Sequence, residues 1–181
     1  MGVAVFLVVL VYTQPATVTT DAGFGVRRGP VEHMPDATFF EVRARPVSFA
    51  GPTSAGLTGV RFTLSGIHHP TSPVTVGWPM ISLELESNVP RPPPPSPTPR
   101  LTFQGEEAYL PHFHKTYPPT QRNGMYLEPF DFVCDPARLI EVTGRGSLTA
   151  DFEGITITFS DDDTAALVAF SRAILTGSPN P

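Results

Sequence analysis

Apolar and polar residues alternate with a period of two along several stretches of the chain. Within residues 38–45, Phe40, Val42 and Ala44 alternate with the charged residues Glu41, Arg43 and Arg45. Successive side chains of a β-strand point to opposite faces, so this pattern predicts a strand with one buried face. Pro46 follows directly and lacks a backbone N–H, which predicts that the strand lies at a sheet edge or bulges there.

The same period recurs further along the chain. Residues 59–66 place Val60, Phe62 and Leu64 on one face, and residues 101–103 and 138–144 are shorter strand candidates. Residues 125–134 bring Phe130, Phe132 and Cys134 to a common face. By contrast, residues 14–37 carry turn residues every few positions, which predicts a long loop with one short strand at residues 17–20.

In residues 72–87 the apolar positions change parity. Val74, Val76 and Trp78 share one face. The parity changes across residues 77–79, and Ile81, Leu83 and Leu85 follow with the opposite parity. Such a change requires a β-bulge or a crossing from one sheet to another. Crossing strands of this kind are typical of sandwiches and barrels.

The clearest local pattern lies near the C-terminal end. Two alternating runs, residues 147–152 and 155–160, flank the dipeptide Glu153–Gly154, which predicts a β-hairpin. Ser160, followed by three aspartates, is typical of a helix N-cap, and Gly177 is typical of a residue that ends a helix. The two residues predict a helix between them. The apolar residues between them, at helical spacing, are Leu167, Phe170 and Ile174.

These patterns predict a mainly β fold: an antiparallel β-sandwich or jelly-roll-like sheet pair with one C-terminal α-helix. Residues 1–181 are expected to form a single domain. The apolar run at residues 3–11 contains five valines and no preceding positive charge, so we expect an integral strand rather than a leader peptide.

The proline-rich segment (residues 89–100) holds seven prolines and is expected to adopt polyproline II conformation. We expect this segment to be a stiff spacer within one domain. As an alternative, it separates an N-terminal sheet region from a C-terminal one. Arg91, Pro94 and Pro97 also match the spacing of a basic-x-x-Pro-x-x-Pro ligand for an aromatic groove.

Composition narrows the classes of partner. The 181 residues include 22 prolines and 15 glycines, and the net charge is −5. The basic residues are scattered, whereas a nucleic-acid-binding surface needs them clustered, so we expect no nucleic-acid partner. We also expect no membrane partner. Because Cys134 is the single cysteine, the chain cannot form an internal disulfide. We expect Cys134 to be a buried thiol.

The histidines are the candidate metal ligands. On an extended segment His112 and His114 point to the same side, as two ligands of one metal can. His68 or His69, with Glu128 or Glu107 as the carboxylate, could complete the site.

This His-x-His spacing resembles the first motif of the cupin family, a double-stranded β-helix, over residues 105–114. The resemblance implies a divalent metal held by His112 and His114. The family places a glutamate four or five residues after the second histidine, where this chain has Pro118 and Pro119, and no histidine follows His114. We therefore do not assign the chain to this family, and we expect residues 111–124 to form a surface loop without a metal or other cofactor.

Since the sequence shows no catalytic constellation, we expect a non-enzymatic structural or interaction module, such as a virion or other assembly component. Its partners would be other proteins or further copies of the chain, in the cytoplasm or a virion. Secretion would follow if residues 3–11 were a leader. The alternatives are a cupin-like metal-dependent enzyme that uses His112 and His114, and a small immunity or adaptor protein.

Overall fold

The computed structural model describes residues 19–20, 25–32, 34–54, 56–71, 79–92, 99–145 and 147–178, with the backbone alone for residues 19–20, 35 and 109–116. The predicted strand at residues 3–11 and the stretch with Val74, Val76 and Trp78 lie outside this part of the chain. No helix among the described residues is long and apolar enough to cross a lipid bilayer.

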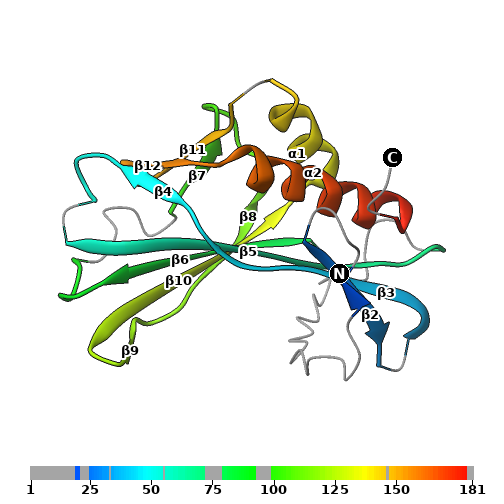
Figure 1. The fold of residues 1–181 in the computed structure, drawn as a ribbon, viewed down its shortest axis with the longest axis horizontal. Coiled ribbons are helices and arrows are strands. Elements are labelled where there is room, and N and C mark those ends of the chain that lie inside the picture. Colours follow the sequence, from blue (N-terminus) through cyan, green and yellow to red (C-terminus); the bar gives the residue numbers. More distant parts are fainter. Residues whose placement is uncertain are drawn as a thin grey trace, which may run out of the picture.

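Two antiparallel sheets and two helices make up the described structure (Figure 1). The large sheet has eight strands in the order β1-β2-β3-β5-β6-β10-β8, with β9 also paired to β10. Their bounds are β1 (Thr19–Thr20), β2 (Val26–Val31), β3 (Met34–Pro46), β5 (Leu57–His68), β6 (Met80–Ser87), β8 (Tyr109–Thr116), β9 (Thr120–Arg122) and β10 (Met125–Cys134). The small sheet has the order β4-β12-β11-β7, with β4 (Ser48–Ala50), β7 (Leu101–Phe103), β11 (Thr149–Phe152) and β12 (Ile155–Thr158). The helices are α1 (Pro136–Thr143) and α2 (Asp161–Thr176).

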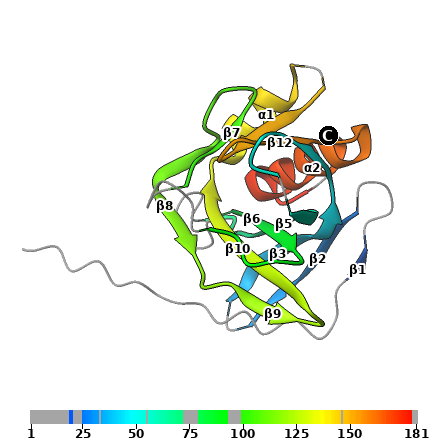
Figure 2. The same cartoon turned by 90° about the vertical axis from the view of Figure 1, so that its left-hand side faces the viewer.

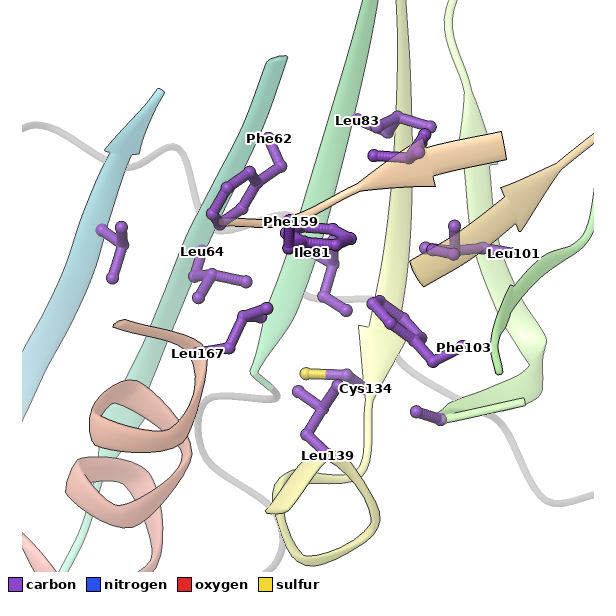
Figure 3. Packing of buried hydrophobic residues seen from close by; sticks show 14 of the residues in the cluster. Phe62, Leu64, Ile81, Leu83, Leu101, Phe103, Cys134, Leu139, Phe159 and Leu167 are labelled. Carbon is purple, nitrogen blue, oxygen red and sulfur yellow. The ribbon is translucent and has the colours of Figure 1, made fainter. Parts of the chain in front are cut away.

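The small sheet and both helices lie over the same face of the large sheet (Figure 1), which we call the inner face. The main hydrophobic core fills the space between these layers and joins side chains of both sheets and both helices (Figure 3). Phe62 from β5 and Phe159, which follows β12, meet edge to face with ring centroids 5.2 Å apart. The predicted fold class, an antiparallel sheet pair with a C-terminal helix, is confirmed.

The C-terminal unit forms as predicted. Glu153 and Gly154 both have positive φ, 49° and 82°, as the tight turn between β11 and β12 requires. Ser160 and Asp163 form a reciprocal capping box at the start of α2, and Gly177 ends the helix with φ 78°.

Strand β3 bends where Pro46 predicted an irregularity. Its pairing with β5 shifts register between Val42 and Arg45, and Ala44, predicted to face inward, is exposed. The bulge is confirmed, but the edge position is wrong because β3 lies between β2 and β5. After the bend, buried Val47 leads into β4, so the chain crosses from the large sheet to the small one.

The prediction of a strand at residues 138–144 is wrong, because residues 136–143 form helix α1. The side chain of Asp135 accepts hydrogen bonds from the backbone N–H groups of Ala137 and Arg138, and Pro136 occupies the first turn. Leu139 and Val142, three residues apart, share the buried face. The described part of the chain therefore forms two helices, where the sequence predicted one.

Two stretches predicted as loops are strands. Within residues 14–37, β2 and the start of β3 form a hairpin, and within residues 111–124 the chain forms most of β8 and all of β9. Neither alternates clearly in sequence, because Gly29, Pro30 and Pro111 interrupt the pattern. Pairing with β3 and β10 supplies the backbone hydrogen bonds that these strands need.

Each sheet takes strands from both sides of the proline-rich segment. Strand β4 precedes the segment and lies in the small sheet, whereas β8, β9 and β10 follow it and lie in the large one. The division between the sheets therefore does not fall at the segment.

Candidate functional site

His68, a candidate metal ligand, holds the end of helix α2. Its Nδ1 donates a hydrogen bond to the backbone oxygen of Ile174 at 2.8 Å, in the last turn of the helix. Gly177 packs against the ring: a Cβ there would lie 3.0 Å from Cδ2 and Nε2 of His68. An imidazole at this position satisfies a carbonyl that the helix leaves without an intrahelical partner.

His69 has a separate role in the turn that follows β5. Its Nδ1 accepts a hydrogen bond from the backbone N–H of Thr71 at 3.3 Å, and the Thr71 hydroxyl lies 3.1 Å from the same nitrogen. The two adjacent histidines thus direct their Nδ1 atoms to different structural contacts.

Glu128, the candidate carboxylate ligand, lies on the inner face of β10 and forms an ion pair with Arg91. Its Oε2 is 3.7 Å from Nη1 of Arg91, and the side chains are 8% and 14% exposed. Burial raises the pKa of Glu128, and the Arg91 guanidinium opposes that rise. Oε1 of Glu128 is buried without a hydrogen-bond partner.

The register of the large sheet separates Glu128 from His68. Glu128 lies opposite Leu85, and Leu85 lies opposite Val60. His68 is eight residues further along β5, so the two levels are about 26 Å apart at ~3.3 Å per residue. One metal ion does not bridge that distance.

His112 and His114 lie on strand β8, and their side chains are outside the described part of the structure. The backbone of His114 pairs with Phe132, which is level with Ile81 and Leu64 across the sheet. From there to His68 the sheet spans three strand spacings, about 14 Å, and four residues along β5, about 13 Å. Among the described residues, no group of three His, Cys, Asp or Glu side chains is arranged to hold a metal.

Arg91, the basic residue of the predicted polyproline ligand, is engaged within the domain. Besides the ion pair with Glu128, its Nη2 donates to the backbone oxygen of Thr53 at 3.4 Å. Pro94 and Pro97 lie outside the described residues. The sequence placed Arg91 and Glu128 in two unrelated candidate sites, and the tertiary structure brings them into contact.

The opposite side of the large sheet, which we call the outer face, holds a groove that the sequence did not reveal. It has a volume of about 460 Å³ and lies over β5, β6 and β10, with residues 117–120 along one side. Its lining side chains include Arg61, Thr63, Ser82, Glu84, Tyr117 and Asp131. The available signal was the row of outward positions in β5 and β6, which carry small polar and charged residues.

Asp131 organises the polar floor of this groove. Oδ1 accepts a hydrogen bond from the hydroxyl of Ser82 at 2.6 Å, and Oδ2 accepts one from the hydroxyl of Tyr117 at 2.7 Å. Desolvation, together with the hydrogen bond to Asp131 and its negative charge, raises the pKa of Tyr117 to about 12. Tyr117 therefore remains a neutral hydrogen-bond donor at physiological pH.

Charges of both signs lie in and beside the groove. Arg61 and Glu84 are directly opposite each other on β5 and β6, and Nη2 of Arg61 lies 3.0 Å from Oε1 of Glu86. The Arg61 side chain is 47% exposed. A cation and carboxylates are thus presented side by side on the outer face.

The single cysteine is confirmed as a buried thiol. Cys134 is 2% exposed and its Sγ donates to the backbone oxygen of Pro79 at 3.2 Å. Burial raises the pKa of this thiol far above its usual range, so it is not a nucleophile at neutral pH.

A second cluster of charges joins α1 to the turn after β7. Arg138 and Arg145 both contact Glu106 and Glu141. Hydrogen bonds from these guanidinium groups lower the pKa of both glutamates. The cluster is largely solvent-exposed and fixes the helix rather than forming a cavity.

Comparison of this chain with protein-family models, with curated proteins and with solved structures finds no match.

Proposed function

We propose that this protein is a non-enzymatic structural module that assembles through the outer face of its large sheet, with a second copy of the chain as partner. The observation that carries the proposal is the mixed-charge groove on that face. No described element covers the part of the outer face that forms the groove, whereas the small sheet and both helices cover the inner face (Figures 1 and 2). Farther along β3 and β5, the outer-face residues Ala37, Phe39 and Ile67 form a separate buried cluster.

The chemistry of the groove suits a contact between identical surfaces. In a two-fold symmetric interface the same patch meets itself, so each cation must find an anion on the same patch. Arg61 and Glu84 satisfy this requirement, because the cation of one copy can face the carboxylate of the other. Thr63 and Ser82 lie between the charges and allow close approach of two sheets.

The reactive groups near the groove favour binding over catalysis. Both carboxylate oxygens of Asp131 already accept hydrogen bonds, and Tyr117 holds its proton at neutral pH. Cys134 is buried on the inner face. These features support a contact surface that is preorganised by hydrogen bonds.

Charge reversal tests the proposal. Sedimentation of the full chain from about 1 to about 100 µM should show a dimer that weakens with dilution. Arg61→Glu and Glu84→Arg should each shift the protein to monomer, because like charges then face each other, and the double variant should restore the dimer.

Arg172→Glu on α2, far from the groove, is the matched control and should leave the dimer intact. Circular dichroism checks that each variant is folded. A folded wild-type chain that remains monomeric over the whole concentration range would overturn the proposal. So would a dimer that none of the groove variants affects.

A further inference from the structure

The ion pair between Arg91 and Glu128 lies where three parts of the chain meet. Glu128 belongs to the inner face of β10, next to the end of the core. Arg91 belongs to the segment that leaves β6, and its guanidinium also contacts Thr53 in the turn between β4 and β5. One side chain therefore connects the large sheet, the start of the proline-rich segment and the crossover to the small sheet.

Both ends of the proline-rich segment are tied to the same neighbourhood. The Thr53 hydroxyl donates to the backbone oxygen of Glu153 at 2.8 Å, in the turn between β11 and β12. At the other end of the segment, the backbone N–H of Arg100 donates to Oε1 of Glu153 at 2.9 Å. Loss of the Arg91 contact would free the first end while Arg100 retains the second.

The charges around Glu128 leave Arg91 as its counter-ion. On β6, Glu84 and Glu86 belong to the outer face, opposite in parity to Leu85, which pairs with Glu128. On β9, Arg122 is exposed, and on β10 the nearest titratable side chain on the same face is Tyr126, two residues away. In the turn between β11 and β12, the backbone oxygen of Glu153 accepts from Thr53, and its carboxylate accepts from the backbone N–H of Arg100. Among the described residues, Arg91 is the cation in ion-pair contact with Glu128.

We propose that Arg91 and Glu128 form an acid-sensitive latch, in which a proton on Glu128 releases Arg91 and residues 88–92 from the domain. The proton goes to the carboxylate, and the guanidinium keeps its charge but loses its counter-ion. An unpaired charge at 14% exposure is unfavourable, so the Arg91 side chain moves into solvent.

The direction of the pH effect follows from the environment of Glu128. Its pKa is raised by burial, so it takes up a proton at milder acidity than an exposed glutamate. Burial disfavours the ionised form of Glu128 in the folded protein. The contribution of Glu128 to the free energy of unfolding therefore increases as the pH falls through its folded-state pKa. When Arg91 is displaced and Glu128 stays buried, Glu128 loses the cation that opposes the rise of its pKa, so a proton on Glu128 favours the open latch as well as the folded domain.

Hydrogen exchange of the full chain, followed by mass spectrometry of peptides that contain Ser54 and Leu57, tests the latch. The backbone N–H groups of these two residues are hydrogen-bonded within the turn that Arg91 holds through Thr53. Between about pH 7.5 and about pH 5, after correction for intrinsic exchange rates, we expect protection in wild type to fall several-fold. Glu128→Gln imitates the protonated carboxyl and should have low protection at both pH values. Glu86→Gln, which breaks the ion pair with Arg61 on the outer face, is the matched control and should behave as wild type.

A second measurement examines the guanidinium directly. Arg91 in Glu128→Gln should react with phenylglyoxal several-fold faster than in wild type at the same pH, as read from modified peptides. If Glu128→Gln does not fold, Arg91→Gln replaces it as the test variant. Hydrogen exchange of the same peptides in Arg91→Gln should then no longer depend on pH after the correction for intrinsic rates. Equal protection and equal Arg91 reactivity in folded Glu128→Gln and wild type would overturn the latch, as would a pH dependence that persists in Arg91→Gln. The latch lies on the inner face, so its failure would leave the dimer proposal for the outer face untouched.

Discussion

The same three strands, β5, β6 and β10, build both faces of the large sheet, yet the faces differ in chemistry. On the inner face Phe62, Leu83 and Phe132 are buried beneath the small sheet and the helices. On the outer face Thr63, Ser82 and other small polar or charged residues line a groove. Alternation assigns every residue to one face or the other, but the covering elements decide which face becomes core.

The largest expected effect contrasts two neighbours on β5. Phe62→Ala removes a fully buried ring and its edge-to-face contact with Phe159, and should lower the free energy of unfolding by about 3–5 kcal/mol. Thr63→Ala, one residue further and on the outer face, should change it by less than about 1 kcal/mol. Urea denaturation of both variants measures the difference, and similar losses would show that the outer face is as tightly packed as the inner one.

The next effect separates the two adjacent histidines. His68→Ala removes the hydrogen bond to Ile174 O at the end of α2 and should cost about 1 kcal/mol of unfolding free energy. His69→Ala is the control and should cost less than about 0.5 kcal/mol, because its contacts lie within an exposed turn. Thermal unfolding of both variants tests this order, and a larger loss in His69→Ala would contradict it.

A smaller effect concerns ionisation on the outer face. Since the folded-state pKa of Tyr117 is raised from 10.0 to about 12, its contribution to stability is complete below pH 10 and is lost as the pH rises through 12. The difference in absorbance at about 295 nm between wild type and Tyr117→Phe should appear near pH 12. Asp131→Asn removes the acceptor charge and should move that transition toward lower pH. A wild-type difference centred at pH 10 would show that the hydrogen bond to Asp131 does not persist in solution.

The smallest expected effect is a metal content near zero. His68 and His69 have structural contacts, and the register keeps Glu128 and His114 far from His68. Purified protein should contain well under one zinc, iron, manganese, nickel or copper per chain by inductively coupled plasma mass spectrometry. About one tightly held metal, lost in both His112→Ala and His114→Ala, would support the metal-enzyme alternative instead.

How well the sequence predicted an element depended on how local its signals are. The hairpin of β11 and β12 and the helix α2 carry their turn, cap and stop residues within the segment itself, and both formed as predicted. Helix α1 was missed although Asp135 and Pro136 form a proper start, because its eight residues also allow an alternating pattern. Strands β2 and β8 were missed because glycine and prolines interrupt their period, and pairing with a neighbour compensates for that.

The candidate sites followed the same division. The sequence identified Arg91 by the spacing of a polyproline ligand, His112 and His114 by their His-x-His spacing, and His68, His69 and Glu128 as further candidate metal ligands. It did not indicate that Arg91 would pair with Glu128, or that Tyr117, Ser82 and Asp131 would share a hydrogen-bonded cluster. Those contacts join residues from separate strands, and sheet order sets them.

By itself, the sequence determined the mainly β character, the inward and outward positions of β5, β6 and β10, and the whole C-terminal unit. These properties follow from side-chain period and backbone preferences, which act over a few residues. Only the tertiary structure decided the order of strands in the two sheets, the crossing of the chain into β4 and the position of the open groove on the outer face. Those outcomes depend on which distant strands bury one another's apolar surface and satisfy one another's backbone hydrogen bonds, and no single segment carries that information.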